Sequence, residues 1–295
     1  MPPSARPRRS ALYMPGSNGR ALEKSRNLAA DALIFDLEDA VAADAKATAR
    51  GTVASAVGSG GYDRRELLLR VNALGTPWGR EDLAAAARMP IDGVVLPKVE
   101  SPEEIREAEA VLVANGASDG LPIWCMMETP LGILRAAEIA AASRRLGGLV
   151  MGTADLTNDL HARHTRDRLP MLTSLGLCLL AARAFGLAIL DGVHLDLADD
   201  EGFAQSCRQG RELGFDGKTL IHPKTIAAAN TAFSPSADDV VWSRRIIAAH
   251  ETATRGGTGV VLVDGKLIEN LHVENARRLL ALAAAIKERD TTISA

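Results

Sequence analysis

Acidic residues follow several short apolar runs of this 295-residue chain, at the point where each run ends. Glu128 comes directly after IWCMM, and Asp155 comes two residues after LVMGT. Small or uncharged residues flank both carboxylates, so neither has an obvious cationic neighbour in the sequence. Two such carboxylates suit Mg²⁺, which binds oxygen ligands and keeps several waters. We therefore expect a magnesium site at Glu128 and Asp155.

Two further stretches place charged side chains at the ends of apolar runs. Arg70, in LLLRV, offers a planar and permanently charged fork for a substrate carboxylate or carbonyl oxygen. A metal together with this arginine would suit a dicarboxylic or keto-acid substrate. The stretch ALIFDLEDAV (32–41) carries Asp36, Glu38 and Asp39. From their residue types alone, these three carboxylates could face water, a basic group or a metal.

The elements that must position these residues recur as short apolar runs separated by helical patterns. The runs are at 10–14, 32–37, 67–71, 94–98, 123–127, 149–153, 188–191 and 218–221. Alternating strands and helices of this number predict an α/β fold, a (β/α)8 barrel whose chemistry lies at the carboxyl ends of the strands. An open doubly wound sheet is the competing architecture, although no G-x-G-x-x-G or Walker-type loop follows any run.

The pattern changes after Pro235. We expect a helix at 237–255, a strand pair around 259–268 with Asp-Gly at its turn, and a final helix at about 273–287. This is more chain than a barrel needs. The sequence therefore predicts a catalytic barrel domain at 1–233 and a C-terminal extension at 234–295, which would cover the barrel as a lid, pack against a neighbouring subunit, or do both.

Composition excludes several classes of protein. The net charge of −3 and pI of about 6.1 give no basic field for nucleic acid or an anionic membrane. Three widely spaced cysteines indicate a reducing compartment, and no apolar stretch reaches the roughly 18–20 residues of a membrane span. Without a signal-peptide pattern, we expect a soluble cytoplasmic globular protein. The basic residues Arg6, Arg8 and Arg9 are interpreted as a solvated tail, with a phosphate contact as the alternative.

Long motifs throughout the chain resemble one family, the citrate lyase β-subunit-like CoA-ester lyases of the HpcH/HpaI aldolase group. The motifs are RSALYMPGSNGRALEK, ALIFDLEDAVAADAK, LLLRVNALGTPWGREDL, VVLPKVESPEEI, METPLGI, MGTADL and LGFDGKTLIHPKTI. The resemblance implies a TIM barrel, dependence on Mg²⁺, a trimer or hexamer, and a CoA thioester or related acyl compound as substrate.

The resemblance also assigns roles to residues. Glu128 and Asp155 match the two metal-binding carboxylates, and Arg70 matches the substrate-binding arginine. Glu38 and Asp39 match an acidic pair that lies beside the metal and holds its waters and the arginine. This leaves Asp36 to make a structural hydrogen bond deeper in the barrel. The stretch Gly16-Ser17 matches a first loop near the substrate or the thioester end of CoA.

One stretch departs from the family pattern. The lyases of this family usually carry an Asp in the C-terminal lid, with a Pro soon after it. The Asp acts as acid/base in the site of the neighbouring subunit. Here Glu269 stands where Asp is expected and Leu271 replaces the Pro. An extra methylene moves the carboxyl group, which matters where geometry sets the rate. We expect Glu269 to be the acid/base.

The expected activity is Mg²⁺-dependent cleavage of a 3-hydroxyacyl-CoA such as malyl-CoA. Segments such as GLCLLAARAFGL (176–187) resemble the branch that includes (3S)-malyl-CoA thioesterase, so hydrolysis to malate and CoA is a second possible activity. A CoA-independent class II aldolase acting on a 2-keto acid is a third, and a non-catalytic subunit that has kept the barrel is a fourth. A true citrate lyase β-subunit would also need an acyl-carrier partner.

Overall fold

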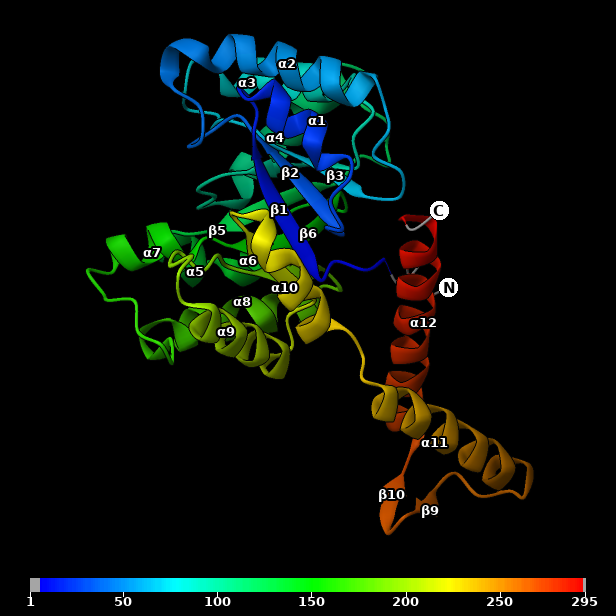
Figure 1. The fold of residues 1–295 in the computed structure, drawn as a ribbon. Helices are drawn as coiled ribbons and strands as arrows, with labels where there is room; N and C mark the ends of the chain where they lie inside the picture. Colours follow the sequence, from blue (N-terminus) through cyan, green and yellow to red (C-terminus); the bar gives the residue numbers. More distant parts are fainter. Residues whose placement is uncertain (1–5, 294–295) are drawn as a thin grey trace. The chain divides into compact units, whose positions relative to one another are not determined.

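The computed structural model describes residues 6–293 of the chain, and within them eight parallel strands close into a barrel (Figure 1). Neighbouring strands pair in chain order, and β8 pairs back with β1. The strands are β1 Ser10–Pro15, β2 Ala32–Asp36, β3 Glu66–Arg70, β4 Gly93–Leu96, β5 Ile123–Met127, β6 Leu146–Met151, β7 Ala188–Asp191 and β8 Gly217–Leu220. The predicted (β/α)8 barrel is confirmed, and the open doubly wound sheet is wrong.

Helices lie on the outside of the barrel between successive strands (Figure 1). They are α1 Gly19–Ser25, α2 Lys46–Gly58, α3 Gly79–Ala86, α4 Pro102–Ala114, α5 Pro130–Leu134, α6 Ala136–Ala140, α7 Thr153–Asp159, α8 Leu172–Ala184, α9 Asp200–Leu213 and α10 Ile226–Phe233, with 3-10 turns η1 Ala43–Ala45, η2 Leu169–Met171 and η3 Pro223–Thr225. Outward strand residues such as Leu33 and Phe35 join helix residues such as Val53 in one buried apolar layer.

The barrel interior is filled by side chains two residues apart on each strand, as the pleat requires. Ala32 and Ile34 of β2 meet Leu68 of β3 in this inner cluster. Continuing the same alternation toward the carboxyl end, the next inward position is Asp36 on β2 and Arg70 on β3, and the two are paired in the sheet register. The strand pattern therefore brings charged side chains to one end of the barrel.

Arg8 and Arg9 close the opposite end of the barrel. The Nη2 of Arg8 lies 2.7 Å from Oε1 of Glu66, at the amino end of β3. Arg9 is buried and donates from its Nε and Nη2 to Asp31, at 2.9 Å each. The expectation of a solvated tail is wrong for these two residues, because each guanidinium is paired with a buried carboxylate.

A second compact unit begins at Ser234, whereas Arg8–Phe233 form the barrel unit. It consists of α11 Ala237–Arg255, a hairpin of β9 Val261–Val263 and β10 Lys266–Ile268, and α12 Asn270–Ile293. Apolar residues of all four elements, including Ile246 and Val273, form its own core. α12 begins three residues earlier and extends further than expected. The role of this unit as a lid and oligomer contact stays a prediction.

Two local features explain the elements of this unit. Ser236 and Asp239 form a capping box, in which each side chain accepts from the backbone of the other, so α11 begins where predicted. Asp264 and Gly265 both have positive φ, at 48° and 76°, which is the geometry of the Asp-Gly hairpin turn. None of the helices in residues 6–293 has the length and hydropathy of a membrane span.

Candidate active site

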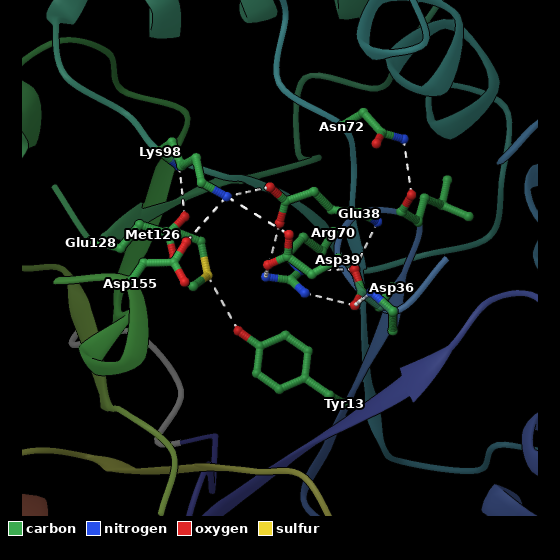
Figure 2. A network of polar contacts seen from close by, with 12 residues as sticks. Tyr13, Asp36, Glu38, Asp39, Arg70, Asn72, Lys98, Met126, Glu128 and Asp155 are labelled. Carbon is green, nitrogen blue, oxygen red and sulfur yellow. Dashed lines mark hydrogen bonds and ion pairs between the residues drawn. The ribbon is translucent and has the colours of Figure 1, made fainter. Parts of the chain in front are cut away.

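A cavity of about 420 Å³ opens at the carboxyl ends of the barrel strands. Its polar side holds Asp36, Asp39, Arg70, Glu128 and Asp155. Its apolar side is lined by Tyr13, Met126, Met151, Val193, Leu195 and Ile221. The two sides together suit a small acid with an apolar portion. Figure 2 shows the polar contacts, which join residues from six strand ends.

Arg70 is held rigidly by carboxylates on the neighbouring strand. Its Nε and Nη2 donate to the two oxygens of Asp36, at 2.8 and 2.6 Å. Burial works against the charged guanidinium, but the hydrogen bonds and charge of Asp36 raise the pKa of Arg70 well above its usual value. The predicted fork for a substrate is therefore already occupied on one edge by Asp36, and the remaining Nη1 edge faces Glu38 and Asp39.

Asp36 has a larger role than the expected structural hydrogen bond deeper in the barrel. It lines the cavity, and besides Arg70 it accepts from the backbone N–H of Glu38 at 2.8 Å. That bond forms an Asx turn directly after β2. The prediction placed Asp36 outside the site because strand alternation alone did not reveal that Arg70 would sit in register beside it.

Glu38 and Asp39 lie beside Arg70, as predicted. Oε2 of Glu38 is 2.9 Å from Nη1 of Arg70, and Oδ2 of Asp39 is 3.4 Å from the same nitrogen. Burial raises the pKa of Glu38, and its charged neighbours Arg70 and Lys98 act in the opposite direction. The pair thus holds the arginine in place. Its predicted role toward metal-bound water stays a prediction.

Glu128 points into the cavity because it continues the inward alternation of Trp124 and Met126 on β5. Its side chain is only 2% exposed, and Oε1 accepts the backbone N–H of Lys98 at 2.8 Å. Burial raises the pKa of Glu128 to about 7, and the negative charges of Glu38 and Asp155 act in the same direction. A buried carboxylate in an acidic surrounding would be stabilised by a further cation.

Glycine at position 152 makes room for this carboxylate. A Cβ on Gly152 would lie 2.3 Å from Oε2 and 2.4 Å from Cβ of Glu128, far inside van der Waals contact. No larger residue fits without displacing the glutamate. The MGTADL motif therefore contributes both Asp155 and the space that Glu128 occupies.

Asp155 lies in the first turn of α7 and is 37% exposed toward the cavity. Neither Glu128 nor Asp155 has a cationic neighbour in the sequence, but the fold supplies one to Asp155. Lys98 comes from the end of β4, and its Nζ is 3.1 Å from Oδ2 of Asp155. The barrel brings together a lysine and an aspartate that are 57 positions apart in the sequence.

Sequence reasoning placed Lys98 at a strand end but gave it no role, and it did not single out Tyr13. Lys98 ends the run VVLPK, which was the available signal, and its Nζ also lies 2.8 Å from Oε1 of Glu38. The ring of Tyr13 lies under the guanidinium of Arg70, with 4.9 Å between its centroid and Cζ, and its hydroxyl donates to Sδ of Met126. Tyr13 looked like an ordinary strand residue because its partners come from other strands.

The remaining predicted residues do not line this cavity. Gly16 packs against β2, where an added Cβ would lie 2.7 Å from the carbonyl oxygen of Asp36, and Ser17 is exposed beside it. Glu269 belongs to the second unit, between β10 and α12, and its backbone N–H donates to Nδ1 of His272. Substrate contact by Gly16 and Ser17 and acid/base chemistry by Glu269 stay predictions.

The donor set of the cavity fits a hard divalent cation. In residues 6–293, no group of three or more His, Cys, Asp or Glu forms a ready-made metal site. Glu128 and Asp155 nevertheless offer carboxylate oxygens to the same space. In the described residues, four carboxylates and Arg70 line that space, and Glu38 and Lys98 contact them from beside it. Two carboxylates completed by water are the kind of coordination that Mg²⁺ accepts.

Comparison with known proteins identifies the family. The family model described as HpcH/HpaI aldolase/citrate lyase matches residues 9–223, which include every charged residue of the cavity. The chain belongs to this enzyme family. It is 53% identical over 282 residues to the (3S)-malyl-CoA thioesterase of Cereibacter sphaeroides, covering 96% of each chain. It is 38% identical to the citrate lyase subunit beta of Escherichia coli, covering 94% of each.

Solved structures agree with the fold of this family member. The protein CitE from Mycobacterium tuberculosis, in complex with magnesium, acetoacetate and coenzyme A, superposes with a TM-score of 0.77. The match is at 31% identity and covers 95% of this chain and 99% of that one. A second M. tuberculosis structure, citrate lyase beta subunit with oxaloacetate and magnesium, superposes with a TM-score of 0.67 at 32% identity, covering 80% and 100%.

Proposed function

We propose that this enzyme is a magnesium-dependent hydrolase of a 3-hydroxyacyl-CoA thioester, with (3S)-malyl-CoA as its substrate. The observation that carries the proposal is the convergence of Glu128 and Asp155 beside a fixed Arg70 in one cavity. The 53% identity to a (3S)-malyl-CoA thioesterase favours hydrolysis over the carbon–carbon cleavage expected first from the sequence.

Glu128 and Asp155 would hold the metal, as complexes of related structures with magnesium support. Bound Mg²⁺ supplies a Lewis acid that polarises substrate oxygens. Arg70 would orient the carboxylate of the malyl group through Nη1, where the substrate would displace the exposed Asp39, which lies 3.4 Å from that nitrogen. Because Asp36 fixes the guanidinium before substrate arrives, little side-chain entropy is lost on binding.

The apolar side of the cavity would position the thioester. Tyr13, Met126 and Leu195 face the acidic side across the cavity and exclude bulk water from one flank of the substrate. In the described chain, the cavity lining includes no Ser, Cys or His. Water itself would then attack the thioester carbon, its C–S bond would break, and the released thiolate would take up a proton as malate forms. We assign the acid/base role to Glu269, supplied within a trimer or hexamer.

Carbon–carbon cleavage is the second candidate, favoured by the 38% identity to a citrate lyase subunit beta. In that reaction the hydroxyl proton of malyl-CoA is removed, the bond between the second and third carbons of the malyl group breaks, and glyoxylate leaves. The resulting thioester enolate takes a proton and becomes acetyl-CoA. The same cavity residues would bind the substrate, so the two reactions differ in whether water is admitted to the thioester.

The deciding experiment measures free CoA thiol and glyoxylate separately after incubation with malyl-CoA and Mg²⁺. Free CoA without glyoxylate supports the thioesterase, and glyoxylate with acetyl-CoA supports the lyase. No binding or turnover of any CoA thioester, with activity on a free keto acid, would instead support the CoA-independent aldolase.

Metal dependence is tested on variants of the two carboxylates. Glu128→Ala and Asp155→Ala should each lose about 100-fold or more in turnover, as expected when positioning of the reacting centre fails. Asp200→Asn is the control, because it removes a carboxylate from an exposed pair with Lys224 at the rim of the same barrel. Wild-type Mg²⁺-dependent turnover in either site variant would contradict the metal assignment.

A further inference from the structure

Lys98 contacts every carboxylate of the metal-binding side of the cavity (Figure 2). Its Nζ lies 2.8 Å from Glu38, 3.1 Å from Asp155 and 3.8 Å from Asp39. Its backbone N–H donates to Glu128 at 2.8 Å. One residue thus holds both proposed metal ligands, Glu128 through the main chain and Asp155 through the ammonium group.

The backbone conformation of Lys98 directs its side chain toward these carboxylates. Its φ of 50° places it in the left-handed region, which a lysine rarely adopts. A residue stays in such a conformation only when its surroundings enforce it, and such residues cluster at functional sites. Here the hydrogen bond to Glu128 holds the main chain, while the side chain leaves β4 and lies over the acidic cluster.

The ammonium group stands where a divalent cation would be attracted. The Nζ and a metal ion would compete for Oδ2 of Asp155, because two positive charges cannot share one carboxylate oxygen at contact distance without strong repulsion. Glu38 offers Lys98 a second partner, since it lies closer to Nζ than Asp155 does. The lysine side chain is 42% exposed, so it has room to move away from Asp155.

We propose that Lys98 is a positioning residue that takes the place of the metal: it neutralises Asp155 and Glu38 when the site is free of Mg²⁺, and it leaves Asp155 when Mg²⁺ binds. The inference rests on the proposed function for the identity of the metal. It has two consequences. The acidic cluster stays ordered without metal, and the affinity for Mg²⁺ is set below what Glu128 and Asp155 would give alone.

The test is the Mg²⁺ affinity of Lys98→Met, measured by titration calorimetry with MgCl₂ and no substrate. Methionine keeps the length of the side chain and the backbone N–H that binds Glu128, but removes the charge. We expect the Kd for Mg²⁺ to fall about tenfold or more. Lys224→Met is the matched control, because it removes a lysine from the same end of the barrel that is paired with Asp200 instead.

Two further measurements separate displacement from a general effect of charge. Without metal, Lys98→Met should melt at a lower temperature than Lys224→Met, and saturating Mg²⁺ should raise its melting temperature by more than it raises that of the wild type. Crystals of the wild type with and without MgCl₂ should show that Nζ leaves Asp155 but keeps its contact with Glu38 when the metal is present.

The outcomes distinguish this inference from the proposed function. Unchanged or weaker Mg²⁺ binding by Lys98→Met, or a lysine that stays on Asp155 in the metal-bound crystal, overturns the inference and leaves the function standing. Tighter Mg²⁺ binding by Lys98→Met, together with no turnover of malyl-CoA by the wild type, supports the inference and overturns the proposed substrate. Absence of Mg²⁺ binding in both the wild type and Lys98→Met overturns both.

Discussion

The buried pair of Asp36 and Arg70 offers a sharp test of how the site is held together. Both side chains are nearly inaccessible, and the carboxylate binds Nε and Nη2 at 2.8 and 2.6 Å. Asp36→Asn keeps one acceptor oxygen but turns an amide N–H₂ toward the second guanidinium nitrogen. Breaking a buried pair by neutralising one partner costs about 3–5 kcal/mol, because a buried charge is left uncompensated. Since Glu38 still lies 2.9 Å from Nη1, we expect the lower end, about 3 kcal/mol.

The assay is urea unfolding of wild type and variant, followed by circular dichroism, without metal or substrate. Asp200→Asn is the matched control in the same unit: it removes the same charge from an exposed pair, which is worth about 1 kcal/mol or less. A loss for Asp36→Asn that is no larger than for the control would refute the reasoning. Turnover should also fall, because Arg70 loses the partner that fixes its orientation.

Three further predictions concern other parts of the site. Gly152→Ala should reduce turnover about 100-fold, because its Cβ would displace Glu128, whereas Gly176→Ala, with open space around the added Cβ, should leave turnover unchanged. Burial raises the pKa of Glu128 to about 7, so the folded state binds the proton of its carboxyl group more tightly than the unfolded state does. The stabilising contribution of this group is therefore present below pH 4.5 and is lost as the pH rises toward 7. In EDTA, melting curves from pH 5 to 8 should therefore decline less for Glu128→Gln than for the wild type; an equal decline would contradict the shift. Mixing inactive Glu269→Ala subunits with inactive Arg70→Ala subunits should restore part of the activity if Glu269 acts in a neighbouring subunit, and no recovery would count against that arrangement.

Much of the barrel followed from local pattern. Strand runs such as 123–127 are short, apolar and bounded by turn residues, so the period of the sequence reveals them. Residues at the ends of such runs meet at one end of a parallel barrel whatever the details of packing. For this reason Arg70, Glu128 and Asp155 were expected together, and the structure places all three in one cavity.

What the sequence could not supply was pairing between strands. The bonds of Asp36 to Arg70 and of Lys98 to Asp155 join residues 34 and 57 positions apart, and their geometry depends on the register and closure of the barrel. The sequence around Asp155 contains no cation, and nothing in the sequence around Asp36 distinguishes it from the neighbouring acids. The arginines Arg8 and Arg9 were misread for the same reason, because their carboxylate partners come from other strand ends.

The sequence by itself determined the elements and the chemistry available: eight strands, a C-terminal helical extension, and carboxylates with an arginine at the strand ends. These depend on periodicity and residue type, which are local properties of the chain. Only the tertiary structure decided which charges neutralise one another, because Coulomb interactions depend on distance and burial in space. It turned a set of isolated acids into one network, in which Asp36 fixes Arg70 and Lys98 lies between Glu38 and Asp155.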